Sequence, residues 1–251
     1  MTSHLFILTG ASRGMGLAIA RQLLKPGNTL LCISRKANDT LAVQAKQAGV
    51  SLEQWTQDLA RSADASARLE QWLREQAGAG FASATLINNA GMIPRTGPLS
   101  EADADNLSQA LSVGLEAPMQ LSSAFLRATG GWNAKRKVLN ISSGLGRKAM
   151  ASQSVYCAAK AGMDHFTRCV ALEEALKPNG AAVCSLAPGV IDTDMQTQLR
   201  GADSAAFPDQ QMFANLKSQG VLSSPEEAAA SVLAYLARPD FGKQAVADIR
   251  D

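Results

Sequence analysis

Tyr156 and Lys160, in the segment YCAAK, are residues whose types and spacing could do chemistry. Four positions apart on a helix, they differ by about 40 degrees of rotation and share one face. An ammonium beside a phenol favours the phenolate, so we expect the pKa of Tyr156 to fall below its ordinary value of about 10. Such pairs also occur by chance, but Ser142 and Ser143 at the end of a preceding apolar run strengthen the chemical interpretation.

A second candidate is the glycine-rich segment TGASRGMG, which begins at Thr9 directly after the apolar run LFIL. A strand, a glycine turn and a helix in this order direct unpaired N–H groups at one point, where anions bind. Gly10 can form the tight turn, Gly14 can let a pyrophosphate approach the backbone, and Gly16 can let the helix lie close to the sheet. A tight turn without a ligand is the alternative.

The residues after the second apolar run indicate which dinucleotide would bind. An NAD-selective carboxylate is expected about 20 residues beyond the glycines, but this chain has Ser34, Arg35 and Lys36 there. Arg35 would attract a 2′-phosphate, and Arg13 in the glycine turn could approach the same group from the other side. The sequence therefore favours NADP over NAD, with a solvated strand-end charge as the alternative for Arg35.

Short apolar runs alternate with longer helical patterns along the chain. We expect strands around residues 5–10, 29–35, 52–59, 84–91, 137–144, 181–189 and 245–249. We expect helices near residues 14–25, 39–48, 63–77, 103–128, 153–177 and 225–237. Short strands separated by helices are what a parallel sheet with right-handed crossovers requires. The sequence thus predicts an α/β, Rossmann-like single domain over residues 1–251, with a doubly wound parallel sheet of about seven strands and helices on both faces.

The long stretch 193–224 lies between the last two predicted strands and shows no clear strand pattern. Segments of this kind are more often lids or binding loops than spacers. We expect a lid over the substrate, with plain packing as the alternative for its apolar residues Met195, Leu199, Phe207, Met212, Phe213 and Leu216.

Composition and charge exclude several classes of protein. No apolar run approaches the roughly 18 residues that span a bilayer, so we expect no membrane insertion. Lys and Arg outnumber Asp and Glu by 24 to 22, which is too small a margin to indicate a nucleic-acid partner. The four cysteines and two histidines show no metal-ligand spacing, so we expect no metal site. The start MTSHLFIL has no features of a secretory signal, so we expect a cytoplasmic protein.

Five motifs occur in the order and spacing of the short-chain dehydrogenase/reductases: TGASRGMG, NNAG (88–91), NISSG (140–144), YCAAK and PGVIDT (188–193). The chain resembles this family over essentially its whole length. The segments DTDMQ (192–196) and ALEEALKPNG resemble the sepiapterin reductase and benzil reductase branch most.

The resemblance implies roles for individual residues. In reduction, Tyr156 would be the general acid, Lys160 would lower its pKa and hold the nicotinamide ribose, and Ser143 would hydrogen-bond the same substrate oxygen. Ser142 would point away. Asp248 matches an aspartate with which sepiapterin reductases anchor a substrate amino group, and a strand-end carboxylate is the alternative. The residues implied to bind NADP are Gly10, Ser12, Arg13, Gly14, Met15, Gly16, Arg35, Asp58, Leu59, Asn89, Ala90, Gly91, Tyr156, Lys160, Pro188, Gly189, Val190 and Thr193.

One position departs from the family pattern. Where the family usually has an asparagine, in a pattern like NLTAP, this chain has GLEAP with Gly114. That asparagine distorts its helix and positions a water for proton relay, so its absence puts the relay in question. We expect a slower but competent NADPH-dependent reductase of a small planar or aromatic ketone or diketone. A nucleotide-binding regulator without turnover is the alternative. Pairing of the helices near 103–128 and 153–177 across a two-fold axis would give a homodimer or homotetramer.

Overall fold

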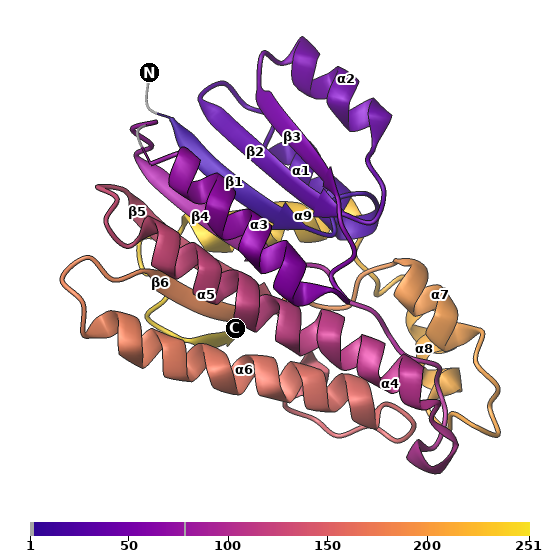
Figure 1. The fold of residues 1–251 in the computed structure, drawn as a ribbon. Helices are drawn as coiled ribbons and strands as arrows, with labels where there is room; N and C mark the ends of the chain where they lie inside the picture. Colours follow the sequence, from indigo (N-terminus) through magenta and orange to yellow (C-terminus); the bar gives the residue numbers. More distant parts are fainter. Residues whose placement is uncertain (1–2, 78) are drawn as a thin grey trace.

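One continuous parallel sheet organises the computed structural model, which describes residues 3–77 and 79–251 (Figure 1). Its strands are β1 (His4–Thr9), β2 (Asn28–Ser34), β3 (Ser51–Thr56), β4 (Ser83–Asn88), β5 (Lys135–Ile141), β6 (Ala182–Ala187) and β7 (Val246–Asp248). Within the described ranges the seven strands lie in the order β3-β2-β1-β4-β5-β6-β7. The chain winds outward from β1 in one direction and then in the other, so the predicted doubly wound α/β fold is confirmed.

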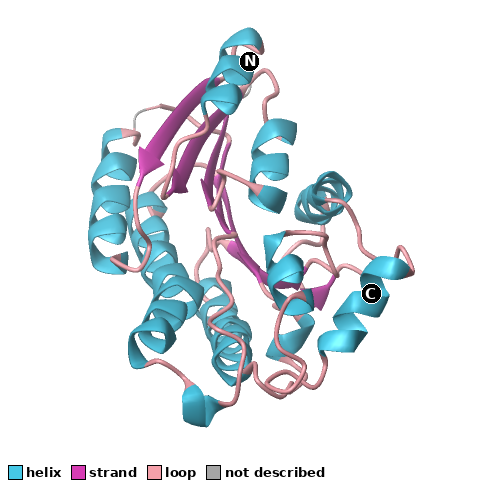
Figure 2. Cartoon of the chain, turned by 90° about the vertical axis from the view of Figure 1, so that its right-hand side faces the viewer, coloured by secondary structure: helices cyan, strands magenta, loops and turns pink. Residues whose placement is uncertain are grey.

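Helices cover both faces of this sheet (Figure 2). On one side lie α1 (Gly14–Gln22), α2 (Asp39–Gln47) and α9 (Pro225–Ala237), and on the other lie α3 (Ser62–Glu75), α5 (Ala117–Thr129) and α6 (Ser154–Ala175). The remaining helices are α4 (Ala104–Leu111), α7 (Asp194–Arg200) and α8 (Gln210–Ser218). No helix in the described part of the chain is long and apolar enough to cross a membrane.

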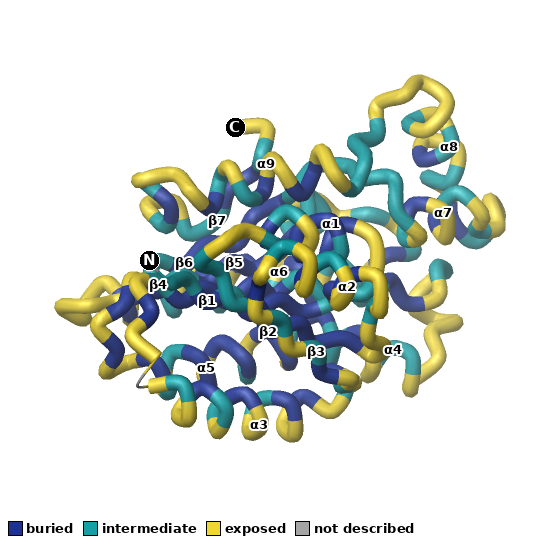
Figure 3. The backbone as a smooth tube through the Cα atoms, turned by 90° about the horizontal axis from the view of Figure 1, so that it is seen from above, coloured by how far each residue is buried: buried dark blue, intermediate teal, exposed yellow. Residues whose placement is uncertain are grey.

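Two apolar layers hold the helices to the sheet. In β1, Leu5 and Ile7 pack toward α3 and α5, whereas Leu8 packs toward α1 and α9. Burying one such side chain stabilises the fold by about 1.5–3 kcal/mol. Buried segments accordingly concentrate along the strands, and exposed ones on the outer sides of the helices (Figure 3). Because apolar layers hold the strands on both faces, the positions of the strand ends are fixed. The candidate site lies at these ends.

The predicted helix at 103–128 is not continuous. A single turn of π-helix, Ser112–Glu116, separates α4 from α5. Gly114 is buried in this turn, and a Cβ atom added there would lie 3.3 Å from the Cβ of Ala159 in α6. Because glycine has no side chain, the widened turn can press its backbone against α6. The helix distortion that the family resemblance attributes to an asparagine therefore exists here without one.

The stretch 193–224, for which no helix was predicted, is partly helical. It contains α7 and α8, and Ile191 and Ser223 at its base form an isolated parallel bridge. Figure 1 shows the two helices standing beside the main body of the sheet. The segment is thus a folded unit closed at its base.

Candidate active site

The carboxyl ends of β1 and β4 are joined by the hydroxyl of Thr9. This oxygen accepts hydrogen bonds from the backbone N–H groups of Asn89, at 3.0 Å, and Ala90, at 2.9 Å. The side-chain amide of Asn89 donates to the carbonyl of Thr9 at 2.9 Å. The glycine turn and the segment NNAG are therefore held against each other. Thr9 was not identified from the sequence as a site residue. Its position at the end of the first predicted strand was the one feature that could have indicated it.

The glycine turn has a shape that other residues could not adopt. Gly10 has a φ of +72°, and a Cβ atom there would lie 2.9 Å from the Cα of Ala90. A Cβ atom on Gly16 would lie 2.1 Å from the carbonyl oxygen of Gly10. Helix α1 begins at this turn with neither a capping side chain nor an acidic residue in its first turn. Its free N–H groups and positive dipole end fit a dinucleotide phosphate.

Two cations lie at this edge of the sheet. Arg35 follows the last residue of β2 and is exposed, and Arg13 is the N-cap residue of α1. The guanidinium of Arg13 is paired with the carboxylate of Asp194 at the start of α7, and both side chains are largely exposed. Asn38, just beyond Arg35, donates to the carbonyl of Ser12 at 3.2 Å, which ties the end of β2 to the glycine turn.

Of the two residues expected near an adenine, Asp58 is exposed and Leu59 is buried. The side chain of Leu59 packs in the apolar layer beneath α3. Its side chain is therefore part of the core, and the exposed surface at this point comes from Asp58.

Tyr156 and Lys160 share one face of α6, as their spacing predicts. The Nζ atom of Lys160 lies 5.7 Å from the centre of the Tyr156 ring. It donates a hydrogen bond of 2.7 Å to the carbonyl of Ile141 at the end of β5. A Cβ atom added to Gly91 would lie 3.9 Å from the same Nζ atom. The ammonium is thus buried where the ends of β4 and β5 meet α6.

The prediction that the pKa of Tyr156 falls is wrong for the protein without a bound dinucleotide. Burial raises the pKa of Tyr156 above its ordinary value, and a hydrogen bond with Ser143 opposes this rise. Burial also lowers the pKa of Lys160 to about 8, against the attraction of Asp164. The sequence pattern indicated the cationic neighbour but not the burial, and burial has the larger effect. A raised pKa keeps the phenol protonated, as a proton donor must be.

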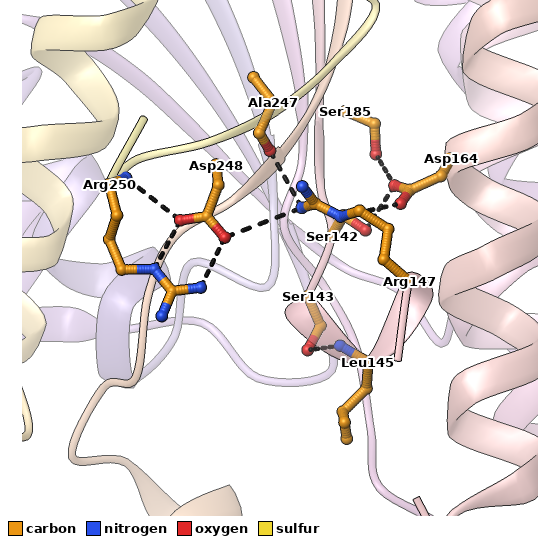
Figure 4. A network of polar contacts seen from close by, with 9 residues as sticks. All are labelled: Ser142, Ser143, Leu145, Arg147, Asp164, Ser185, Ala247, Asp248 and Arg250. Carbon is orange, nitrogen blue, oxygen red and sulfur yellow. Dashed lines mark hydrogen bonds and ion pairs between the residues drawn. The ribbon is translucent and has the colours of Figure 1, made fainter. Parts of the chain in front are cut away.

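Ser142 and Ser143 point in opposite directions, as strand alternation predicts. The hydroxyl of Ser143 accepts from the N–H of Leu145 at 3.2 Å and lies on the side of Tyr156. The hydroxyl of Ser142 donates to the buried carboxylate of Asp164 at 2.6 Å (Figure 4). Asp164 was not identified from the sequence as a site residue. Its spacing of one helical turn from Lys160 could have indicated it.

The segment after β6 reaches back to the glycine turn. Its residues Pro188, Gly189 and Val190 are half-buried, and a methyl of Thr193 lies 3.7 Å from the position of a Cβ on Gly14. The terminal methyl of Met195 lies 3.7 Å from the equivalent position on Gly91. The start of α7 therefore closes over the space between α1, β4 and Lys160.

Apolar residues of the segment 193–224, which we call the lid segment after its expected role, gather beside Tyr156 of α6. Its buried side chains Leu199, Phe207 and Phe213 cluster with Ile93 and pack against Tyr156, Met150, Met195, Ala202 and Leu216. The rings of Phe207 and Phe213 lie 5.6 Å apart. Met212, which was expected on the inner side, is instead 42% exposed. The segment thus forms an apolar wall beside the phenol.

Asp248 lies at the end of β7 with its carboxylate already engaged. Both of its oxygens accept hydrogen bonds of 2.7 Å from Arg250, and Arg147 lies 4.0 Å away (Figure 4). These cations, Arg250 first, hold the pKa of Asp248 below its ordinary value. The residue is therefore an ionised carboxylate whose charge is balanced within the chain.

Comparison with known proteins agrees with this geometry. The short chain dehydrogenase family matches residues 4–204. The chain is 35% identical over 235 residues to a benzil reductase ((S)-benzoin forming) of Bacillus cereus, covering 94% of each chain. It is 30% identical over 256 residues to the sepiapterin reductase of Meriones unguiculatus, covering 98% of this chain and 95% of that protein.

The fold is shared with solved structures as well. A short-chain dehydrogenase from Sphingobium yanoikuyae in complex with NADPH superposes with a TM-score of 0.75 at 25% identity, covering 97% of this chain and 86% of that one. The fold, the motif order and these relatives agree that the chain belongs to the short-chain dehydrogenase/reductase family and is an oxidoreductase of its carbonyl-reductase kind.

Proposed function

We propose that this protein is an NADPH-dependent reductase of a small, neutral aromatic ketone or 1,2-diketone. The observation that carries the proposal is the placement of Ser143, Tyr156 and Lys160 around one point beside the end of β5. Their protonation suits reduction, because Tyr156 keeps its proton and the buried Lys160 lies 5.7 Å from its ring centre.

The glycine turn and the cations beside it support NADPH as the dinucleotide. The phosphates would rest on the free N–H groups of α1 between Gly10 and Gly16. The nearby Arg35, and Arg13 after leaving Asp194, would attract a 2′-phosphate. Asn89, Ala90, Gly91 and the segment from Pro188 to Thr193 would border the remaining part of the dinucleotide. When bound, NADPH supplies the hydride for the reaction.

The protein side chains then handle the substrate oxygen. Ser143 donates a hydrogen bond that orients the carbonyl, and Tyr156 transfers its phenolic proton to the oxygen as negative charge develops there. The ammonium of Lys160 stabilises the phenolate that remains. The apolar lid wall of Leu199, Phe207 and Phe213 excludes water, which strengthens these electrostatic interactions.

The state of Asp248 favours a neutral diketone over a pterin as the substrate. A free carboxylate would attract a substrate amino group, but this one is held by two hydrogen bonds from Arg250 and lies near Arg147. The relatives named above include a benzil reductase and a sepiapterin reductase. Because the charge of Asp248 is balanced, we propose that this chain prefers substrates like those of the benzil reductase.

A substrate panel tests the proposed function. Loss of NADPH absorbance is followed with benzil, other aromatic diketones, aromatic monoketones and sepiapterin. We expect turnover with diketones at a kcat/KM at least about tenfold above that with sepiapterin, because the amino group finds no free anion. Preference for sepiapterin would overturn the substrate class. Binding of NADPH without turnover on any carbonyl would favour the nucleotide-binding regulator.

A further inference from the structure

A buried carboxylate outside the set described above lies one helical turn below Lys160. Asp164 of α6 is 1% exposed. One of its oxygens accepts hydrogen bonds from Ser142, the residue after β5, at 2.6 Å, and from Ser185 of β6, at 2.7 Å. Its other oxygen has no hydrogen-bond partner among the described residues. A buried anion with half of its acceptor capacity unused costs stability unless its charge serves another group.

The surrounding charges show which group that is. Figure 4 shows Arg147, which follows Ser143 by four residues, lying between Asp164 and Asp248. The Nε atom of Arg147 is 3.7 Å from the free oxygen of Asp164, too far for a hydrogen bond, and a third of its side chain is exposed. This solvated cation balances Asp164 in part. A second cation near Asp164 is Lys160, which is buried one helical turn earlier on the same helix.

We propose that Asp164 is a positioning residue that keeps Lys160 protonated and fixes the strand end carrying Ser143 against the catalytic helix. The hydrogen bond that it accepts from Ser142 sets the direction of Ser143, the next residue along the chain. Its negative charge offsets the burial of the ammonium. The inference rests on the proposed function, because it assigns a role within the same proton transfer.

The pKa values agree with this geometry. Burial lowers the pKa of Lys160 to about 8, and the attraction of Asp164 acts in the opposite direction. Among the described residues, Lys160 is also faced by Tyr156 on its own helix, the Ile141 carbonyl of β5 and the backbone of Gly91. On β6, burial raises the pKa of the Cys184 thiol to about 11, so this neighbour of Asp164 stays neutral. Without Asp164, Lys160 would lose its proton at a lower pH.

The test compares pH profiles of diketone reduction for variants that separate charge from hydrogen bonding. Asp164→Asn keeps the acceptor oxygen for Ser142 and Ser185 but removes the charge. We expect the alkaline limb of kcat to move to lower pH by on the order of one unit. Arg147→Gln removes the cation that balances Asp164. We expect the alkaline limb of kcat for this variant to move to higher pH, because the full charge of Asp164 then acts on Lys160. Ser185→Ala removes a hydrogen bond but no charge, and we expect lower thermal stability with an unmoved limb.

Opposite shifts for Asp164→Asn and Arg147→Gln, with Ser185→Ala unmoved, support the inference. Unmoved limbs in both charge variants would overturn it and leave Asp164 a structural residue. If Asp164→Asn does not fold, Arg147→Gln alone tests the inference: a shift of its alkaline limb to higher pH supports it, and an unmoved limb overturns it. If the wild type turns over no carbonyl, the proposed function fails. The pKa of Lys160, followed by ¹⁵N NMR of labelled lysine in wild type and Arg147→Gln, then decides the inference separately.

Discussion

At the scale of single residues, spacing predicted which side chains meet but not their protonation. Four positions on a helix placed Tyr156 and Lys160 on one face, and strand alternation separated Ser142 from Ser143. The raised pKa of Tyr156 could not be predicted, because it depends on burial by elements distant in sequence. The engagement of Asp248 by Arg147 likewise depends on how β7 lies beside the segment after β5.

Cofactor preference is also decided by single residues. Replacing Arg35 by Ala removes an exposed cation at the end of β2, and we expect NADPH binding to weaken at least about tenfold, since a charge-assisted contact with phosphate contributes about 1.5–3 kcal/mol. NADH binding should change little. Titration of each dinucleotide by fluorescence measures both constants. The neighbouring Lys36→Ala is the matched control, and an equal loss for the two dinucleotides would contradict the assignment.

At the scale of elements, the strands and most helices were predictable because they are apolar runs and amphipathic patterns of ordinary length. The break between α4 and α5 was not predicted, because a π-turn arises from packing against α6 rather than from local propensity. The two helices in residues 193–224 were missed because the whole stretch was interpreted as a lid or binding loop; α7 has only seven residues, and α8 has nine, as many as α1 and α2. Helices so short depend on tertiary packing.

The π-turn leads to a prediction at Gly114. We expect Gly114→Asn to raise turnover, because the amide restores a site for the relay water, and to require Ala159 to shift by a few tenths of an ångström. Gly114→Ala makes the same contact with Ala159 but adds no amide. Its effect is on helix stability, since glycine costs up to about 1 kcal/mol relative to alanine in a helix. We therefore expect no gain in turnover for Gly114→Ala. Equal kcat and pH profiles for Gly114→Asn and the wild type would show that the relay does not limit the rate.

The lid segment leads to a second prediction at this scale. Phe213 of α8 is buried against Phe207, and truncation to Ala removes a large part of the apolar cluster beside Tyr156. We expect the KM for diketone to rise about tenfold, which corresponds to about 1.4 kcal/mol, with an unchanged Kd for NADPH. Met212→Ala changes a 42% exposed side chain on the same helix and is the control. Weaker NADPH binding with an unchanged KM would show that the segment covers the dinucleotide instead.

At the scale of the whole molecule, the sheet brings motifs from four parts of the sequence to one edge, as parallel strand order requires. The surface carries an apolar feature that the monomer leaves uncovered. Leu172 and Leu176 at the end of α6 are 72% and 87% exposed. Long helices that pair across a two-fold axis would bury them.

We therefore predict that the protein is a homodimer or homotetramer in solution. Changing Leu172 and Leu176 together to Glu should shift it to smaller species, because charges are unfavourable in a buried interface. Sedimentation velocity measures the change. Val43→Glu alters a 56% exposed apolar residue on α2 and should leave the assembly intact. A monomeric wild type would contradict the prediction.

The central claim is that Tyr156 gives its proton to the substrate oxygen, and Tyr156→Phe tests it most directly. This substitution removes one hydroxyl and keeps the ring beside Lys160. A single-turnover mixture of enzyme, NADPH and diketone, followed by absorbance, should show a rate at least about 100-fold slower than wild type. Fluorescence titration should show unchanged NADPH binding. Hydride transfer at the wild-type rate in the variant would contradict the account.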